Sequence, residues 1–208
     1  MRSMVGLYAI VDPAACKGRD PLDIARAILR GGCAALQLRD KSGSDRGVLA
    51  LARAMSVLAR EVGVPFFVDD RLDIAIASGA DGVHLGQDDL PIDVARAQAS
   101  TLLVGISTHD ETQRARAEAS GADLVGFGPV FPTTSKERPD ALVGLPGIAA
   151  AVRAARVPVV AIGGIDLARV VALRAHGVTL AAAISAVCAA DDPEASARAL
   201  HRALRGLA

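Results

Sequence analysis

Aromatic residues are scarce in this chain: they make up 2% of its 208 residues, and tryptophan is absent. Proteins that bind single-stranded nucleic acid stack bases on aromatic side chains, so this composition disfavours that function. Charge of one sign is lacking as well, because 23 Lys and Arg residues balance 23 Asp and Glu residues. Since no net charge attracts a polyanion, we expect no nucleic-acid partner, and any anion must bind at a local site.

Cysteines and long apolar runs are equally sparse. Cys16, Cys33 and Cys188 are isolated in the sequence and lack the spacing of a metal site. Such cysteines are typical of reduced thiols in a cytoplasmic protein. No apolar run approaches the roughly 18–20 residues of a membrane span, and Asp12-Pro13 interrupts the first apolar run too early for a secretory signal. We therefore expect a cytoplasmic protein with no membrane association.

What the chain does have is an alternation of short apolar runs with stretches of helical period. The strand-like runs lie at 5–11, 34–38, 65–68, 82–85, 102–106, 123–127, 158–162 and 179–184. The helical stretches lie at 22–30, 45–62, 72–78, 92–99, 111–120, 145–155, 166–176 and 193–206. Such alternation predicts parallel strands joined by right-handed crossovers. The number of units favours a (β/α)8 TIM barrel, a single domain over residues 1–208.

The active site of such a barrel lies at the carboxyl ends of the strands, so the polar residues that follow each strand are the candidates. After the second strand, Gln37, Arg39 and Lys41 alternate in sequence and should face the same side. An amide and two cations are suited to a phosphate, to which Arg offers a fork and Lys a point charge. The alternative is a solvated edge on which Arg39 pairs with Asp40.

Two acidic pairs follow the next two strands, Asp69-Asp70 and Asp88-Asp89. Neighbouring carboxylates repel one another unless a cation lies between them. Mg²⁺ binds through one or two carboxylates and keeps its other positions for water and substrate phosphates. The pairs therefore predict a magnesium–diphosphate site. Alternatively, they cap the helices that follow them.

A serine and a possible helix cap follow the fifth strand. Ser107 precedes the helix start and is free to face the pocket, whereas Thr108 and Glu111 fit a capping box. His84, within the fourth strand, and His109, after the fifth, are each more often structural than functional when considered alone.

Glycines and hydroxyls follow the sixth and seventh strands. The loop at 128–136 carries three hydroxyls and a lysine, which suits either a phosphate cradle or an ordinary surface loop. Gly163-Gly164 allows backbone amides to approach a phosphate beside a helix N-terminus. The alternative is a tight turn in which Asp166 caps the next helix.

Seven ordered segments together resemble the thiamine phosphate synthase family along nearly the whole chain. They are QLRDK (37–41), DDR (69–71), DGVHLGQDDLP (81–91), GISTHD (105–110), GADLVGFGPVFPTTSK (121–136), VPVVAIGGI (157–165) and ISA (184–186). The resemblance implies a transferase that joins hydroxymethylpyrimidine diphosphate to a thiazole phosphate and releases pyrophosphate. It also implies one Mg²⁺ per active site.

The resemblance further implies a role for each matching residue. The expected ligands of the pyrimidine diphosphate are Gln37, Leu38, Arg39, Asp40, Lys41, Asp69, Ser107 and Lys136. Those expected to act in catalysis are Arg39, Lys41, Ser107 and Lys136. The expected ligands of the thiazole phosphate are Thr133, Thr134, Ser135, Gly164, Ile184 and Ser185. The expected magnesium ligands are Asp70 and Asp89. One position departs from the pattern: the family usually has Asn where this chain has Asp69, which adds a negative charge beside the metal.

The implied reaction suits this set of residues. The electron-rich aminopyrimidine can delocalise positive charge as the diphosphate leaves, and the thiazole nitrogen has a lone pair that needs no base. Catalysis then consists of positioning and leaving-group stabilisation. Two alternatives on the same fold are a thiazole tautomerase-like relative and a non-catalytic regulator that binds thiazole phosphate. We expect small-molecule substrates, and a homo-oligomer is compatible with the sequence.

Overall fold

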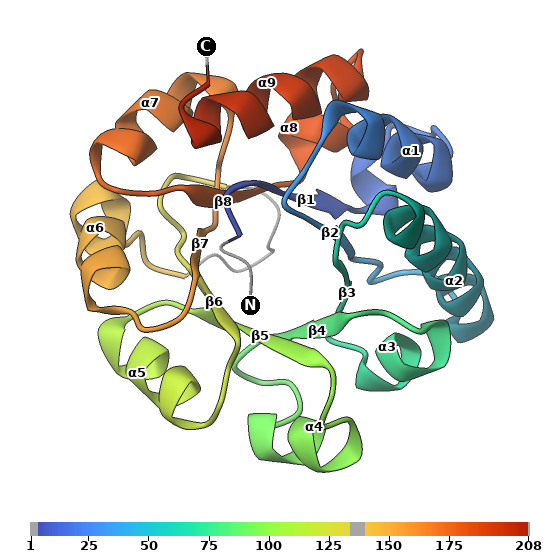
Figure 1. The fold of residues 1–208 in the computed structure, drawn as a ribbon, viewed down its shortest axis with the longest axis horizontal. Helices are drawn as coiled ribbons and strands as arrows, with labels where there is room; N and C mark the ends of the chain where they lie inside the picture. Colours follow the sequence, from blue (N-terminus) through green and yellow to red (C-terminus); the bar gives the residue numbers. More distant parts are fainter. Residues whose placement is uncertain (1–3, 134–139, 208) are drawn as a thin grey trace.

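The chain folds into a closed barrel of parallel strands with helices around its outside (Figure 1). The structure is a computed structural model that describes residues 4–133 and 140–207. The strands are β1 (Gly6–Val11), β2 (Ala35–Leu38), β3 (Phe66–Asp69), β4 (Gly82–Leu85), β5 (Leu103–Thr108), β6 (Leu124–Phe127), β7 (Val159–Ala161) and β8 (Leu180–Ala183). Each strand pairs with its neighbours in sequence, and β8 closes the ring on β1. The predicted TIM barrel is confirmed.

The helices lie between successive strands and after the last one. They are η1 (Pro13–Ala15), α1 (Pro21–Gly31), α2 (Asp45–Glu61), α3 (Leu72–Ser78), α4 (Ile92–Gln98), α5 (Glu111–Ala119), α6 (Gly144–Ala154), α7 (Leu167–Ala175), α8 (Ser185–Cys188) and α9 (Pro193–Arg205). The predicted ranges agree with these bounds to within one or two residues. The sequence patterns missed the short helices η1 and α8. Across the described residues, no helix combines the length and the apolarity needed to cross a bilayer.

Helix caps decide between alternatives that the sequence left open. The prediction that Thr108 and Glu111 form a capping box was wrong. Asp110 caps α5 instead, by accepting a hydrogen bond from the Gln113 amide at 2.8 Å. Thr108 instead ends β5, where its hydroxyl donates to the Gly126 carbonyl of β6 at 2.8 Å. Asp166 caps α7, as one of the alternatives held.

The two acidic pairs do not cap the helices that follow them. The cap positions of α3 and α4 are Arg71 and Pro91, and neither helix has a side-chain cap bond. The carboxylates after β3 and β4 are therefore not used to start these helices.

The apolar residues form an inner and an outer layer. The inner layer fills the barrel and consists of Tyr8, Ala35, Phe67, Leu124, Val160, Leu180 and Ala182. The outer layer packs between strands and helices and includes Leu7, Leu36, Phe66 and Val68. Because side chains alternate along a strand, Gln37 and Asp69 face inward like Ala35 and Phe67 before them. The inner layer is thus the floor on which the polar residues of the strand ends rest.

Candidate functional site

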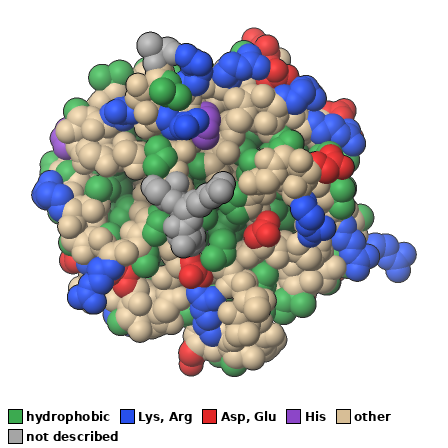
Figure 2. Space-filling view, viewed as in Figure 1, with side chains coloured by type: hydrophobic (Ala, Val, Ile, Leu, Met, Phe, Trp, Pro, Cys, Tyr) green, Lys and Arg blue, Asp and Glu red, His purple; other side chains and the backbone are tan. Residues whose placement is uncertain are grey.

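A cavity of about 490 Å³ lies above this floor, at the carboxyl ends of the strands. The predicted residues that line it are Gln37, Arg39, Asp69, Asp70, Asp89, Ser107, Thr133, Gly164, Ile184 and Ser185. They come from the ends of seven strands, β2 to β8, so closure of the barrel brings them together. On the face of the molecule shown in Figure 2, basic and acidic side chains are interspersed around the circumference.

A hydrogen-bonded chain crosses the floor of the cavity from β1 to β3. The Tyr8 hydroxyl donates to Gln37 Oε1 at 2.8 Å, and Gln37 Nε2 donates to Asp69 Oδ1 at 2.8 Å. Burial, with the charge of Asp69, raises the pKa of Tyr8 well above its ordinary value. Tyr8 therefore keeps its proton and fixes the orientation of the Gln37 amide. Tyr8 was not identified as a site residue from the sequence, because it lies inside a strand. Its only distinguishing feature in the sequence is an isolated aromatic ring that carries a hydroxyl.

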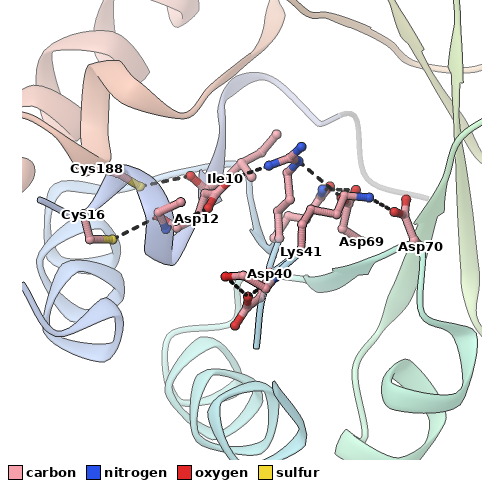
Figure 3. A network of polar contacts seen from close by, with 12 residues as sticks. Ile10, Asp12, Cys16, Asp40, Lys41, Asp69, Asp70 and Cys188 are labelled. Carbon is pink, nitrogen blue, oxygen red and sulfur yellow. Dashed lines mark hydrogen bonds and ion pairs between the residues drawn. The ribbon is translucent and has the colours of Figure 1, made fainter. Parts of the chain in front are cut away.

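Asp69 lies between the two cations that follow β2, Arg39 and Lys41. Its Oδ2 is 3.6 Å from Arg39 Nε and 3.6 Å from Lys41 Nζ, and Lys41 also forms an ion pair with Asp70 (Figure 3). Burial raises the pKa of Asp69, while the charges of Lys41 and Arg39 act in the opposite direction. The cations predicted after β2 thus meet the carboxylates predicted after β3, and together they form a mixed-charge rim.

Three predicted residues of the same segment do not line the cavity: Leu38, Asp40 and Lys41. Lys41 reaches its edge through its ion pairs with Asp69 and Asp70. Leu38 is fully buried in the outer apolar layer, because it alternates with the inward-facing Gln37. Asp40 accepts bonds from the amides of Ser42 and Gly43 at 3.0 and 2.8 Å, and so holds its own loop. The alternative pairing of Arg39 with Asp40 is wrong, since Arg39 donates to Asp12.

The carboxylates that follow β3 and β4 all line the cavity: Asp69, Asp70, Asp88 and Asp89. Asp70 has a φ of 57°, a left-handed conformation that is uncommon outside glycine and often marks functional sites. Asp89 Oδ2 accepts a bond from the Gly86 amide at 2.6 Å, which fixes its carboxylate at the turn. Across the part of the chain that the structure describes, no three His, Cys, Asp or Glu side chains form a ready-made metal cage. The donor set fits Mg²⁺, which takes few protein ligands and leaves positions for water and phosphate.

A buried histidine faces the cavity from β4. His84 Nε2 lies 3.0 Å from the Ser107 hydroxyl, and the ring meets Tyr8 edge-on at a centroid distance of 6.3 Å. Gly105 makes this position possible, because a Cβ there would lie 2.5 Å from His84 Nδ1. Sequence patterns alone favoured a structural role for His84. In the structure, the side chain of His84 points inward from β4 and lies beside the predicted Ser107.

A second cavity of about 390 Å³ adjoins the first beside the β7 and β8 ends. Thr133, Gly164 and Ser185 line both cavities. Gly164 has a φ of 64°, and a Cβ there would lie 2.4 Å from the Pro132 carbonyl oxygen, so glycine is required at this turn. The predicted residues Thr134, Ser135 and Lys136 lie outside the described residues.

Arg169 of α7 supplies a cation to this second cavity. Its guanidinium carbon lies 4.9 Å above the Phe131 ring centroid, and its Nη1 donates to the Gly164 carbonyl. Nη1 is also 3.6 Å from Asp166 Oδ2. No local sequence pattern points to Arg169, because it lies within a helix rather than directly after a strand.

His109 ties the β5 end to the chain beyond β6. Its Nδ1 lies 2.6 Å from the Gly128 carbonyl oxygen, and its Nε2 lies 3.3 Å from Asp140 Oδ2. Both His109 and Asp140 line the first cavity. His109 therefore lines the cavity, which its place in the sequence alone did not reveal.

Comparisons with known proteins agree with one another. Residues 7–187 match the family model described as thiamine monophosphate synthase. The thiamine-phosphate synthase of Chloroflexus aurantiacus is 41% identical over 94% of this chain and 90% of its own. That of a Roseiflexus species is 43% identical over 94% and 83%, respectively. The solved structure of a thiamine phosphate pyrophosphorylase from Pyrococcus furiosus superposes with a TM-score of 0.90 and 36% identity, covering 99% of this chain and 98% of that one.

Proposed function

Because the chain belongs to the thiamine monophosphate synthase family, its activity is that of a thiamine-phosphate synthase, a transferase acting on small molecules, and we propose how its residues perform the coupling. The substrates are hydroxymethylpyrimidine diphosphate and thiazole phosphate. The observation that carries the proposal is one cavity with two polar ends: a mixed-charge rim at β2 to β4, and the glycine turn and serine at β7 and β8.

The diphosphate binds at the mixed-charge rim. Arg39 and Lys41 supply positive charge there, and the Tyr8–Gln37–Asp69 chain fixes the amide that contacts the pyrimidine. The distances support this role because the two cations already meet around one carboxylate. Ser107 lies on the same wall beside His84. Lys136, outside the described residues, is proposed as a further contact of the diphosphate.

Asp70 and Asp89 would hold Mg²⁺ against this diphosphate. The proposal is supported by their shared position in the cavity lining and by the absence of a helix-capping role for either. When bound, the ion supplies positive charge that stabilises the departing pyrophosphate. Lys41, which pairs with Asp70 in the structure, contributes to the same charge balance.

The substitution itself needs positioning more than proton transfer. The bond between the pyrimidine methylene carbon and the diphosphate oxygen breaks, and its electron pair leaves with pyrophosphate. The thiazole nitrogen then donates its lone pair to that carbon. Arg39 and Lys41 stabilise the charge that develops on the leaving group. No general base is required, which agrees with a cavity whose histidines His84 and His109 are engaged with Ser107 and Gly128.

The thiazole phosphate binds at the other end of the cavity. Thr133, Gly164, Ile184 and Ser185 line this end, and Arg169 adds a cation from the second cavity that adjoins it. Thr134 and Ser135, outside the described residues, are proposed to extend this site. Since both ends belong to one cavity, the thiazole nitrogen can approach the pyrimidine carbon directly.

A coupling assay tests the proposal. Purified protein is incubated with both substrates and Mg²⁺, and thiamine phosphate and pyrophosphate are measured. We expect equal amounts of both products, and none when either substrate is omitted. Conversion of thiazole phosphate alone, without coupling, would indicate a tautomerase-like relative. Tight thiazole phosphate binding without pyrophosphate release would indicate a regulator.

A further inference from the structure

Asp12 is a buried acid directly after β1 that has no role in the site described above; its exposed fraction is 6%. We propose that Asp12 is a positioning residue, which holds the Arg39 guanidinium in place for the diphosphate of the pyrimidine substrate. This inference rests on the proposed function. Asp12 itself is not part of the cavity lining that the described residues form, whereas Arg39 is. Asp12 therefore acts through Arg39.

The register of two neighbouring strands brings the pair together. β1 and β2 run parallel with Val11 opposite Leu38, and the Arg39 amide donates to the Val11 carbonyl at 2.9 Å. The next residue on each strand is then Asp12 or Arg39, at the same height above the barrel floor. The contact thus follows from strand pairing and not from a flexible loop.

Both oxygens of Asp12 are occupied. Oδ1 accepts a bond from the Ala14 amide at 3.0 Å and so caps η1, while Oδ2 accepts from Arg39 Nη1. The Asp12 carbonyl accepts from the Cys16 thiol at 3.2 Å (Figure 3). Because these contacts hold the Asp12 carboxylate in place, it can restrict the position of the Arg39 guanidinium that it binds.

A second carboxylate contacts the guanidinium from another direction. Asp69 Oδ2 lies 3.6 Å from Arg39 Nε, so Arg39 is held between the ends of β1 and β3. Its side chain is 21% exposed, compared with 50% for Lys41. A long side chain that is ordered before the ligand arrives loses less conformational freedom on binding. Asp12 therefore favours diphosphate binding without touching it.

The test compares two aspartates that share one local motif. Asp12-Pro13 and Asp20-Pro21 each cap a helix by accepting a bond from the amide two residues on, but no ion pair of Asp20 is present among the described residues. We expect Asp12→Asn to raise the KM for the pyrimidine diphosphate about tenfold. The KM for thiazole phosphate should change no more than in Asp20→Asn.

A double-mutant cycle with Arg39→Gln identifies the path of the effect. In the Arg39→Gln background, adding Asp12→Asn should leave the diphosphate KM unchanged, because the residue it positions is gone. This comparison also serves if Asp12→Asn alone fails to fold, since the double variant has no unpaired buried charge.

Any one of three results would overturn the inference. Asp12→Asn could change the KM for both substrates equally, or its KM values could match those of Asp20→Asn. Adding Asp12→Asn to Arg39→Gln could also raise the diphosphate KM further. Loss of the proposed function looks different. If the wild-type protein releases no pyrophosphate with both substrates present, the coupling assignment fails before any Asp12 variant is measured.

Discussion

Asp69 places a negative charge inside a site that must bind an anion. Its carboxylate lies 3.6 Å from both Arg39 Nε and Lys41 Nζ, and so competes with the diphosphate for them. We expect Asp69→Asn to increase the affinity for pyrophosphate several-fold, because it removes this charge and keeps an oxygen that can accept from Gln37. Calorimetric titration with pyrophosphate in the presence of Mg²⁺ measures the change. Weaker binding would instead indicate that Asp69 contributes to holding the metal.

Arg169 lines the second cavity, where we propose that it contributes positive charge to the thiazole phosphate site. We expect Arg169→Gln to raise the KM for thiazole phosphate about tenfold, since a charge-assisted contact is lost, and to leave the diphosphate KM unchanged. Arg26→Gln is the matched control, because Arg26 pairs with Asp23 on the exposed surface of α1. An equal effect of the two substitutions would remove Arg169 from the site.

Single residues also show where sequence reasoning reached its limit. Gln37, Arg39, Asp69, Asp70 and Asp89 could be placed because they lie at or just after the carboxyl ends of strands, which meet at one rim of a barrel. Tyr8, His84 and Arg169 could not, because two lie within strands and one within a helix. Their approach to the cavity depends on barrel closure, which no local pattern encodes.

Among the elements, the contact between β1 and α9 makes stability depend on pH. His201 of α9 accepts a bond from the Leu7 amide at 3.2 Å, and burial, with the charge of Arg205, lowers the pKa of His201. A lowered folded pKa means that the unfolded chain binds the proton more readily. Stability is therefore full above the ordinary value of about 6.5 and is lost as the pH falls below it.

A pair of melting curves checks this dependence. Between about pH 7.5 and about pH 5.5, the Tm of the wild-type protein should fall more than that of His201→Gln, which cannot take up the proton. His176→Gln is the control, because this histidine ends α7 and bonds the Ala172 carbonyl of its own helix. An equal decrease in Tm in all three proteins would show that protonation of His201 does not cause the loss of stability at low pH.

The elements themselves were largely predictable because their signals are local. The hydrophobic period lies within each long helix, and some helices also begin at an aspartate cap, such as Asp20 or Asp192. The short helices η1 and α8 carry too few residues for a period. Thr108 misled the capping prediction because its hydroxyl bonds the neighbouring strand at Gly126, a contact between residues distant in sequence.

For the whole molecule, the fold and the metal site should be separable. The barrel is held by its inner and outer apolar layers, whereas Asp70 and Asp89 lie at the rim above them. We expect a chelator to abolish coupling and to leave the Tm within about 2 °C, because a site on the surface of a packed core adds little to unfolding stability without its ligand. Addition of Mg²⁺ should restore activity. A large drop in Tm on chelation would show that the metal stabilises the fold.

We propose that the carboxylates at the ends of β3 and β4 and the cations after β2 form one site for pyrophosphate and a divalent cation. Calorimetric titration of pyrophosphate into the wild-type protein and Asp89→Asn, each with Mg²⁺ and with a chelator, tests it most directly. We expect tight binding only to the wild-type protein with Mg²⁺, at least about tenfold stronger than in the other three titrations. Equal affinity in all four would contradict it.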